Sequence, residues 1–557
     1  MTITAIDFET CSVGFFDKEP KKNWKGHPRL ATPIILSFQN SDTCGVVELE
    51  KSEIRPPVTS MVVFHNAGFD LPIGEKVGCW SVQHIRHDSF DCTATLARLS
   101  HNLRPAGLKN LAIQILNEEV TSYEATKEEL SKFLEYAKKD AEFTYRLYPI
   151  LKYEIEAKGM RRLYEEVEKP FILINMECQQ HGLQIERQKV NELVLQLDNE
   201  IEKLKTKFPK NLNTASSTQL KVLLYDELGL PVQFQKGRPS TSRKVLKKLS
   251  SNAMVNQLLE LKEVRAKISQ IKQLERFTDP ITSRIHPFVN PLGADTGRAT
   301  SSNPNLQNID KSSALREIFI ASAGHKLLVF DFSQIEPRVL AHFLPGSSFA
   351  NLFETDDDFY LKLASKFLNH IEVEKSIREV AKLVILATFY GMGKNLLSST
   401  LNITPLQAED ILNSFELSFP EITTFKNRVV SSARDNGFAT GLLGRRRYIE
   451  NLNSKDKFLC ARAERQAFNA VIQGSAATLF KYKLIQLRHA LTREVRFLHH
   501  VHDEVILEAP EAIAAVSSDV CLKVLESPVD WFSVPIKVEG GIGSNWKEAK
   551  NQKMERR

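Results

Sequence analysis

The sequence predicts a multidomain protein of the α+β class. The chain has 557 residues, too many for one hydrophobic core, and this length suggests roughly three to four domains. Its composition, 42% hydrophobic and 25% charged residues, is that of a folded globular protein. Short apolar runs typical of strands alternate with longer stretches whose apolar residues repeat at helical spacing. We therefore expect both strands and helices, distributed over several folding units.

Composition also limits where the protein acts. The apolar runs are shorter than a membrane span, and the amino terminus MTITAIDFET lacks the basic start and apolar segment of a secretion signal. The seven cysteines include no Cys-x-x-Cys pair, which fits a reducing compartment and argues against a structural zinc module. We expect a cytoplasmic protein of the bacterial cell, or of a phage-infected one, without membrane contact.

Acidic residues follow the first predicted elements in pairs. The strand TAIDFETCS carries two acids two positions apart, and therefore on one face. Two further pairs are spaced four apart, as on one face of a helix: one after the strand in VVFHNAGFDLPI, the other within FLEYAKKDAEFTYRLYPIL. The pairs are Asp7 with Glu9, Asn66 with Asp70, and Tyr136 with Asp140. Taken singly, each pair is more simply a helix cap or a polar surface.

Taken together, the four carboxylates and the tyrosine suit phosphodiester hydrolysis with two metal ions. Hard divalent cations such as Mg²⁺ prefer oxygen ligands. Two such ions, about 4 Å apart, activate a water and stabilise the leaving oxygen. Without cations, acids held this close would repel one another strongly. Tyr136 is a candidate for orienting the attacking water.

The next feature is a basic segment. Residues 236–276 contain eleven lysines or arginines and three acids. Within a helix predicted for Met254–Phe277, four of these cations fall near one face: Lys262, Arg265, Lys272 and Arg276. A solvated surface helix is the simpler interpretation, and a stripe that follows a phosphate backbone is the functional one.

A second group of acids lies in the carboxyl-terminal half. In KLLVFDFSQIEPRVLAHF an apolar strand ends at Asp331, and a helix carrying Glu336 follows. In RFLHHVHDEVILEAP two strands, Phe497–Val501 and Val505–Leu507, flank a polar tip at Asp503–Glu504. The histidines of this hairpin also raise the alternative of a zinc site, but the nearest sulfur is far along the chain. If the hairpin lies beside the first strand, the two acids converge on a metal.

Polar side chains repeat along two further predicted helices. SIREVAKLVILATFYGMGK places two cations, an apolar residue and a ring at every fourth position, an arrangement that suits a nucleoside triphosphate. ARAERQAFNAVIQGSAA places three long polar side chains at the same spacing, which suggests contact with a nucleic-acid groove. These residues are Arg378, Lys382, Leu386 and Tyr390, then Arg465, Asn469 and Gln473. For the three arginines Arg445–Arg447 a surface charge cluster is the simplest interpretation.

These motifs resemble two known families. The order D-x-E, N-x-x-x-D, Y-x-x-x-D resembles the proofreading 3'–5' exonucleases of the DEDD superfamily, tyrosine subtype, which have an RNase H-like α/β fold. DFSQIEPR, REVAKLVILATFYG and HDE resemble motifs A, B and C of family A DNA polymerases, the family of bacterial DNA polymerase I and its phage relatives. TGRATSSNPNLQNI, ERQAFNAVIQG and GSNWKEA resemble further signatures of that family, so that the resemblance covers essentially the whole chain.

The resemblance implies a domain layout and a reaction. It implies an exonuclease domain over 1–160 and a right-hand polymerase domain over 161–557. Within the latter we expect a thumb at about 190–285, fingers at about 346–440, and a palm formed by about 161–189, 286–345 and 441–557. The implied reaction is DNA-directed addition of dNTPs to a primer 3'-hydroxyl, with two Mg²⁺ per active site and Mn²⁺ as a substitute, accompanied by 3'–5' proofreading.

The resemblance also assigns roles to residues. The implied metal ligands are Asp331, Phe332 (through its carbonyl) and Asp503 for synthesis, and Asp7, Glu9, Asp70 and Asp140 for degradation. Further implied catalytic residues are Glu504, Lys382 and Tyr136. The implied dNTP contacts are Gln334, Glu336, Tyr360, Arg378, Lys382, Leu386 and Tyr390. The implied DNA contacts are Arg298, Asn305, Gln307, Asn308, Arg465, Asn469, Gln473 and His502, together with the four cations of the basic helix.

Two departures from the family pattern concern residues expected to contact the incoming nucleotide. Leu386 stands where the family usually has a phenylalanine or tyrosine, and a leucine cannot stack like a ring. Tyr360 stands where many relatives have a histidine that contacts the triphosphate, and a tyrosine carries no positive charge at neutral pH. We expect altered handling of dideoxynucleotides from the first departure.

The competing interpretations are a single-subunit RNA polymerase, a DNA-binding protein that has lost catalysis, and a translesion polymerase with an inactive exonuclease. The exonuclease acids and Glu336 disfavour the first, and the presence of all the metal-binding acids disfavours the second. The third stays open as an alternative. No 5'-nuclease domain is expected, and the compact size resembles a phage, prophage or plasmid replicase. Expected partners are primer–template DNA and dNTPs, with a replication helicase, primase or processivity factor as further candidates, for a protein that acts as a monomer.

Overall fold

The computed structural model describes residues 3–12, 31–49, 61–80, 87–101, 106–126, 129–235, 237–309, 314–355, 357–368 and 377–552. The expected mixture of helices and strands is confirmed. In the described part of the chain, no helix combines the length and the apolar composition that a membrane span requires.

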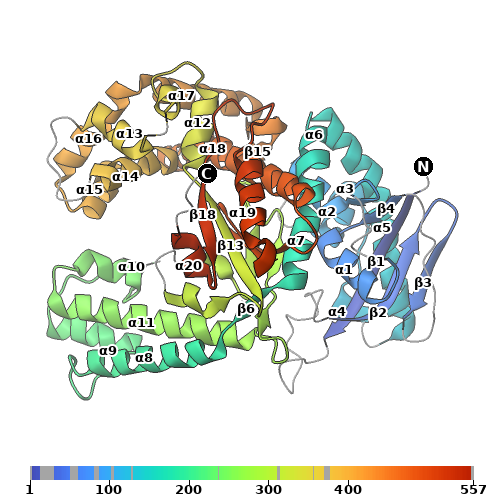
Figure 1. Cartoon of the computed structure of the whole chain (residues 1–557), viewed down its shortest axis with the longest axis horizontal. Coiled ribbons are helices and arrows are strands. Elements are labelled where there is room, and N and C mark those ends of the chain that lie inside the picture. Colours follow the sequence, from blue (N-terminus) through green and yellow to red (C-terminus); the bar gives the residue numbers. More distant parts are fainter. Residues whose placement is uncertain are drawn as a thin grey trace.

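The N-terminal unit, residues 3–157, is a five-stranded sheet with helices packed against it (right side of Figure 1). The strand order is β3-β2-β1-β4-β5. Strands β1, β2 and β3 pair antiparallel, and β4 and β5 run parallel to β1. The strands are β1 Ile3–Ser12, β2 Ala31–Gln39, β3 Cys44–Glu48, β4 Met61–Phe64 and β5 Phe90–Cys92; the helices are α1 Ala67–Lys76, α2 Thr93–His101, α3 Leu108–Leu116, α4 Tyr123–Thr126 and α5 Leu130–Ala157.

A short helical segment joins this unit to the rest of the chain. It comprises α6 (Arg161–Leu163), a π-helical turn (Tyr164–Glu168) and α7 (Lys169–His181). The Tyr164 hydroxyl donates to the buried Asp91 of β5 at 2.8 Å. On the other side, the buried Lys481 donates to Glu168 at 2.7 Å, and Arg445 also pairs with Glu168. The turn therefore ties the N-terminal unit to the carboxyl-terminal half through buried ion pairs.

The centre of the molecule is a four-stranded antiparallel sheet of order β16-β17-β13-β18 (Figure 1). Its strands are β13 His325–Phe332, β16 Arg496–Val501, β17 Glu504–Pro510 and β18 Val538–Gly543. The expected hairpin is confirmed, with longer strands than predicted. Glu504 belongs to β17 rather than to the tip, so the turn consists of His502 and Asp503.

A helical arm, residues 187–276, extends from the central sheet (green in Figure 1). Its two long helices, α8 (Arg187–Lys205) and α11 (Ala253–Arg276), pack along each other. Every third or fourth residue of α11 is buried, as its sequence pattern predicts. The shorter elements are α9 Ser217–Lys221, a π-helical turn Val222–Glu227, β7 Phe234–Gln235, β8 Arg238–Pro239, α10 Arg243–Leu246 and a 3-10 turn Lys247–Leu249.

A helical layer, residues 335–436, lies on the other side of the central sheet (upper left in Figure 1). Its helices are α12 Ile335–Phe343, α13 Phe359–Phe367, α14 Ile377–Tyr390, α15 Lys394–Leu401, α16 Pro405–Ser418 and α17 Pro420–Asn436, with a 3-10 turn at Ala350–Phe353. The chain returns through β14 Phe438–Thr440, a 3-10 turn Leu442–Gly444 and β15 Arg446–Tyr448, and then α18 Lys457–Ala490, α19 Glu511–Glu526 and α20 Trp546–Asn551.

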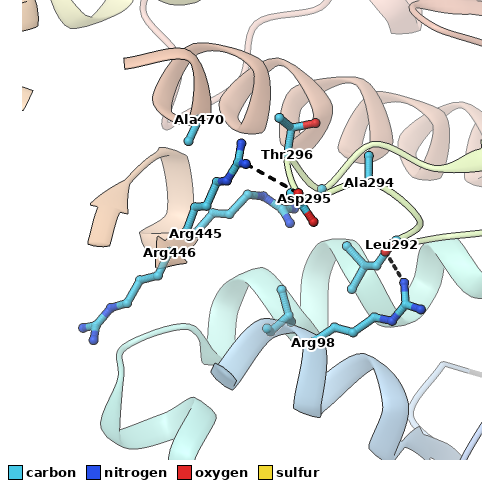
Figure 2. Close-up of a pocket in the computed structure, with 11 residues that line it drawn as sticks. Arg98, Leu292, Ala294, Asp295, Thr296, Arg445, Arg446 and Ala470 are labelled. Atoms are coloured by element: carbon cyan, nitrogen blue, oxygen red, sulfur yellow. Dashed lines mark hydrogen bonds and ion pairs between the residues drawn. The ribbon is translucent and has the colours of Figure 1, made fainter. Parts of the chain in front are cut away.

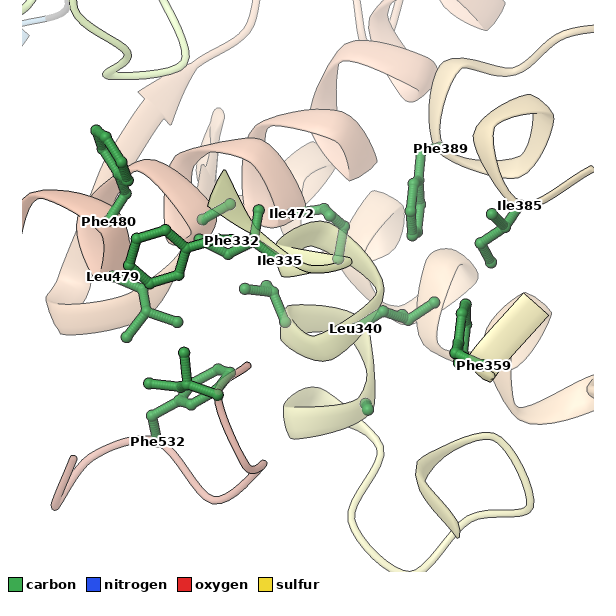
Figure 3. Close-up of a cluster of buried hydrophobic side chains, with 14 of the residues drawn as sticks. Phe332, Ile335, Leu340, Phe359, Ile385, Phe389, Ile472, Leu479, Phe480 and Phe532 are labelled. Atoms are coloured by element: carbon green, nitrogen blue, oxygen red, sulfur yellow. The ribbon is translucent and has the colours of Figure 1, made fainter. Parts of the chain in front are cut away.

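The small strands between these parts are β6 Leu183–Ile185, β9 Arg284–Ile285, β10 Phe288–Asn290, β11 Thr300–Ser302 and β12 Phe319–Ile320, with 3-10 turns at Leu306–Asn308 and Ala314–Ile318. One apolar cluster joins the central sheet to the helical layer (Figure 3). In it, Phe332 at the end of β13 packs edge-on against Phe480 of α18, with ring centroids 5.5 Å apart. The end of β13 is therefore held rigidly, directly beside Asp331.

Buried histidines give this fold a dependence on pH. Burial lowers the pKa of His65 to about 4 and that of His500 to about 3. The ring of His500 contacts Asn175 Oδ1 at 2.7 Å, as expected of a structural residue. Because unfolded histidines protonate near pH 6.5, the unfolded state binds more protons between pH 6.5 and about 4, and stability falls as the pH falls through that range.

We therefore expect a lower free energy of unfolding at pH 5 than at pH 7, by about 2 kcal/mol for each of these two histidines. Urea unfolding at the two pH values measures the difference. His500→Gln should remove the contribution of His500 to this difference, because glutamine does not titrate. The control His87→Gln, at an exposed position, should leave the difference unchanged. A pH dependence that is identical in His500→Gln and the wild type would refute this assignment.

Two candidate metal-dependent sites

The first candidate site lies in the N-terminal unit, where β1 meets α5. Asp7 and Glu9 project from β1 two positions apart, and Asp140 projects from α5, which packs across that strand. Each of the three residues offers a carboxylate oxygen, and these oxygens lie within 4.8 Å of one another. The set therefore has the oxygen chemistry and the spacing that a hard divalent cation requires.

The electrostatics of this site support the fit to a cation. Asp70, near the start of α1, is 1% exposed. Burial raises its pKa well above the ordinary value, and the neighbouring Asp7 raises it further. Burial likewise raises the pKa of Asp7 to about 6, although the Lys109 ammonium opposes this shift. Carboxylates that resist ionisation in this way gain most from a bound cation.

A lysine that the sequence did not single out lies in the same site. Lys109 of α3 forms an ion pair with Asp140 and stands 3.9 Å above the ring centroid of Tyr136. Burial lowers the pKa of Lys109 to about 8, against the attraction of Asp7 and Glu9. Burial, with Glu9 and Asp7 nearby, raises the pKa of Tyr136, so its hydroxyl stays protonated at neutral pH. Asn66 is the residue before α1 and is exposed.

The second candidate site lies at one end of the central sheet. Asp331 stands opposite Glu504 in the β13–β17 pairing. The backbone N–H of Phe332 donates to the backbone carbonyl of Asp503 at 3.0 Å. The hairpin turn that carries Asp503 is therefore fixed directly against the end of the strand that carries Asp331.

The turns on either side of these acids adopt an unusual backbone conformation. Gln334, the residue before α12, has φ 51° and ψ 43°, and His502 has φ 55°. Residues other than glycine occupy this left-handed region at a cost of about 1 kcal/mol or more. Such conformations persist where the surrounding structure fixes them, and they gather at functional sites. Both of them stand within three positions of an acid of this site.

Glu504 is enclosed by donors. Arg316 contacts it at 3.0 Å with both side chains 1% exposed, and the indole N–H of Trp546 donates to it at 2.6 Å. The ammonium of Lys550 lies 3.2 Å from Glu504 and 2.6 Å from Asp331 Oδ2. Glu504 is thus held in place by three groups, one of which it shares with Asp331.

Arg298 contacts two of the other predicted residues. Its guanidinium lies 2.6 Å from Glu336 of α12 and 3.6 Å from Asp503. Burial lowers its pKa, but the two carboxylates raise it by more, so the net shift is upward. Burial also raises the pKa of Glu336, which Arg298 opposes. Gln473 of α18 donates to the Tyr390 hydroxyl at 2.7 Å, so α14 and α18 meet beside this group.

Helix α14 presents its predicted face to solvent next to a pocket of about 600 Å³. Arg378 lines this pocket together with Gln334. The Arg378 guanidinium pairs with Asp358 at 2.9 Å and stands 5.1 Å from the Tyr360 ring centroid. Lys382 and Tyr390 are exposed, and Leu386 packs partly against the apolar cluster.

The side chains of α18 face the carboxyl end of α14. A Cβ added to Gly391 would lie 2.0 Å from Arg465 Cδ, so a larger residue at position 391 would require the Arg465 side chain to shift. Among the residues that the structure describes, none is a hydrogen-bond partner of the buried Asn469 Oδ1 atom. In the loop before β12, Asn305 caps a 3-10 turn by accepting from Gln307 N at 3.0 Å, and Gln307 donates to Ala299 O.

The structure does not bring the four predicted cations of the arm together with this loop. The pocket that contains Asn305 and Asn308 is lined from α11 by Lys267, Gln270 and Gln273. Arg265 turns away and donates to Thr214 at 2.7 and 2.8 Å. The other three cations, Lys262, Lys272 and Arg276, do not line this pocket either.

A further pocket is lined by four arginines and one acid, Asp295 (Figure 2). It lies between α2 of the N-terminal unit, the loop 292–297 and β15. Arg98 donates to the Leu292 carbonyl, and Arg447 pairs with Asp295 at 3.5 Å. The sequence suggested a surface cluster for Arg445–Arg447; for Arg445 this is wrong, because Arg445 is 7% exposed and pairs with Glu168.

Comparison with known proteins identifies a family. The sequence model of DNA polymerase family A matches residues 180–548. Among relatives, the chain is 29% identical to DNA polymerase I of Treponema pallidum, over 88% of this chain and 51% of the relative. It is 30% identical to DNA polymerase I of Chloroflexus aurantiacus (92% and 59%) and 34% identical to the thermostable DNA polymerase I of Thermus thermophilus (73% and 51%). The chain thus spans little more than half the length of these relatives.

A solved structure shares the fold. It is described as the polymerase domain of Pol1 from M. smegmatis in complex with primer–template DNA and dNTP. The TM-score is 0.84, with 24% identity, over 98% of this chain and 95% of that chain. This likeness concerns the fold, and it confirms the expected polymerase architecture.

Proposed function

Because this chain belongs to DNA polymerase family A, we propose that it is a DNA-directed DNA polymerase that adds dNTPs to a primer 3'-hydroxyl. The observation that carries the proposal is the contact between the Asp331 strand and the Asp503 turn, in which the Phe332 N–H donates to the Asp503 carbonyl at 3.0 Å. Two carboxylates at one rigid sheet end, on residues distant in sequence, form the ligand pair that nucleotidyl transfer needs.

In the proposed mechanism Asp331, Asp503 and the Phe332 carbonyl would hold two Mg²⁺. When bound, these ions lower the pKa of the primer hydroxyl and neutralise the departing pyrophosphate. Arg378 binds the phosphates of the incoming dNTP from α14, and Lys382, one turn further on, is the candidate proton donor to pyrophosphate. Gln334 lines the same pocket as Arg378, and the Tyr360 ring centroid lies 5.1 Å from the Arg378 guanidinium. The Glu504 carboxylate remains bound to Arg316 and Trp546 and so fixes the base of the hairpin.

Selection of the deoxy sugar is assigned to Glu336. Arg298 holds its carboxylate at 2.6 Å, and Tyr390 closes the site from α14 beside Gln473. A ribose 2'-hydroxyl would clash with the Glu336 side chain, which Arg298 keeps in place, so that ribonucleotides are rejected. Arg298, Asn305, Gln307, Asn308, Arg465, Asn469, Gln473 and His502 are the proposed primer and template contacts. On the arm, we propose DNA contacts for the pocket residues Lys267, Gln270 and Gln273, in addition to Lys262, Arg265, Lys272 and Arg276.

We further propose that the N-terminal unit is a 3'–5' exonuclease domain of RNase H-like fold. Three observations support it: the carboxylates of Asp7, Glu9 and Asp140 gather within 4.8 Å, Asp70 is buried beside them, and the sheet order is β3-β2-β1-β4-β5. Two Mg²⁺ held there would activate a water for attack on the last phosphodiester. Tyr136 would orient that water through its protonated hydroxyl. The pocket lined by Arg98 and Arg445–Arg447 suits the phosphates of a DNA strand that passes between the polymerase and exonuclease sites.

The proposed setting is replication of phage, prophage or plasmid DNA, by a monomeric enzyme of the cytoplasm, with a helicase, primase or processivity factor as candidate partners. The proposed domain boundaries are those expected from the sequence. The decisive experiment is extension of a labelled primer with dNTPs or rNTPs, together with degradation of single-stranded DNA. Extension with dNTPs alone supports the DNA polymerase, extension with rNTPs supports an RNA polymerase, and extension without degradation refutes proofreading.

Leu386 provides a prediction about substrate choice. It occupies the position between Lys382 and Tyr390 where a ring would stack against the incoming nucleotide, and ring stacking contributes about 0.5–1.5 kcal/mol, or roughly 2- to 10-fold. We expect Leu386→Phe to change the ratio of kcat/KM for dNTP and ddNTP by about that factor. Single-nucleotide insertion kinetics measures it, with the exposed Leu396→Phe of α15 as control. Unchanged insertion kinetics and unchanged selectivity in Leu386→Phe would reject the idea.

A further inference from the structure

Lys550 lies at the polymerase site, although neither the motifs nor the proposed mechanism assigns it a role. Its ammonium is 2.6 Å from Asp331 Oδ2 and 3.2 Å from Glu504 Oε2, and its side chain is 15% exposed. The contact joins a helix at the end of the chain to the acid on β13. A lysine there occupies a carboxylate oxygen that a metal ion would use.

Its position is fixed by the packing of α20. Trp546, fully buried, stands one helical turn before Lys550 and so on the same face, and its indole N–H donates to Glu504 at 2.6 Å. The Arg316 guanidinium stands 4.2 Å over the Trp546 ring. The helix also lies directly on β18, because a Cβ added to Gly543 would meet Ala549 N at 2.4 Å. The backbone of α20 is therefore fixed by packing. A change in the contacts of Lys550 would involve its side chain alone.

Two carboxylates of different character share this ammonium. Glu504 is already held by Arg316 and Trp546 and stays in place. Asp331 is the proposed metal ligand, and a cation bound to the same oxygen at about 2.1 Å would come close to the ammonium and repel it. The side chain then has a second partner at hand, since Glu504 Oε2 lies within ion-pair distance.

We propose that Lys550 is a positioning residue that competes with the divalent cation for Asp331. Without a cation, it holds and neutralises the Asp331 carboxylate; when a cation binds, it withdraws to Glu504. Lys550 therefore weakens cation binding to the polymerase site. A cation displaces it from Asp331 only when Asp503 and the Phe332 carbonyl also bind that cation. This inference rests on the proposed function, since it takes Asp331 as a ligand. The contact of Lys109 with Asp140 repeats the arrangement in the N-terminal unit.

The test is a titration of the full-length protein with Mn²⁺, followed by electron paramagnetic resonance, in an Asp7→Ala, Glu9→Ala background that removes the other acidic site. Lys550→Met removes the charge and keeps the length of the side chain, and Lys550→Arg keeps the charge. The control is Lys547→Met on the same helix, where Lys547 pairs with Glu317 at 2.5 Å. A neighbouring charge changes the affinity of a carboxylate for a proton by about 10-fold or more, and we expect a similar factor for Mn²⁺.

The expected result is about 10-fold tighter Mn²⁺ binding in Lys550→Met, with Lys550→Arg and Lys547→Met close to the wild type. Thermal unfolding provides a second readout: Lys550→Met should melt lower than the wild type in EDTA and gain more from added Mn²⁺. Equal or weaker Mn²⁺ binding in Lys550→Met overturns the inference. If Asp331→Asn leaves the bound Mn²⁺ unchanged, the proposed polymerase site itself fails, so the two failures are distinguishable.

Discussion

Replacing Asp503 by alanine should reduce primer extension by about 10³-fold or more, because loss of a metal ligand removes several kcal/mol of transition-state stabilisation and about 4 kcal/mol corresponds to that factor. Asp503 is the acid that the hairpin turn carries to the end of β13, and nothing else in that turn supplies a carboxylate. Degradation of single-stranded DNA should remain at the wild-type rate, since its proposed site lies in the N-terminal unit. Rapid-quench extension of a labelled primer and gel analysis of single-stranded DNA measure the two activities separately.

A control for this variant is Asp519→Ala on α19, an exposed carboxylate of the same part of the chain. Its extension and degradation rates should both match those of the wild type. If Asp503→Ala extends primers within a few-fold of the wild type, the central sheet is not the site of synthesis. If both activities fall together, the substitution has unfolded the protein, and circular dichroism with Asp503→Asn then separates charge from folding.

Replacing Asp7 by alanine should have the opposite effect. The carboxylate of Asp7 lies within 4.8 Å of those of Glu9 and Asp140, and its loss removes one of the residues proposed to hold the metal ions. We expect degradation of single-stranded DNA to fall by about 10³-fold, while primer extension is kept. Mismatched primer ends should then persist and be extended slowly, which a mismatch-extension assay detects.

The matched control here is Asp42→Ala, an exposed acid in the turn between β2 and β3 of the same sheet. It should leave both activities unchanged. Degradation that persists in Asp7→Ala and also in Asp140→Ala would exclude the acidic cluster as the hydrolytic site. Loss of extension in Asp7→Ala would instead place the polymerase activity in a part of the chain where the proposal does not put it.

Several parts of both sites follow from sequence patterns alone. Asp7 and Glu9 share a face because strand residues two apart do so, and Tyr136 and Asp140 share a face because helix residues four apart do so. The placement of Asp331 at the end of a strand and of Asp503 in a hairpin turn follows from the apolar runs around them. These patterns depend on local geometry, which the sequence specifies directly.

What the sequence did not predict depends on how elements approach each other. Lys109 and Lys550 reach their acids across helix–strand contacts that no periodicity encodes. On the arm, helical spacing correctly groups Lys262 with Arg265, but the side of α11 that faces the pocket is set by packing, and Lys267 and Gln270 lie there instead. For Arg445, a run of three arginines predicts a surface, whereas the buried Glu168 draws one of them inside.

The π-helical turn before α7 determines how the molecule can be divided. A fragment that begins at residue 180, where the family match begins, would lack Glu168 and would leave the ammonium of Lys481 and the guanidinium of Arg445 in the interior without their counter-ion. An uncompensated buried charge costs about 3–5 kcal/mol, a large share of the stability of an ordinary domain. A stable polymerase fragment therefore has to retain the turn at Tyr164–Glu168, which also contacts Asp91 of the N-terminal sheet through Tyr164.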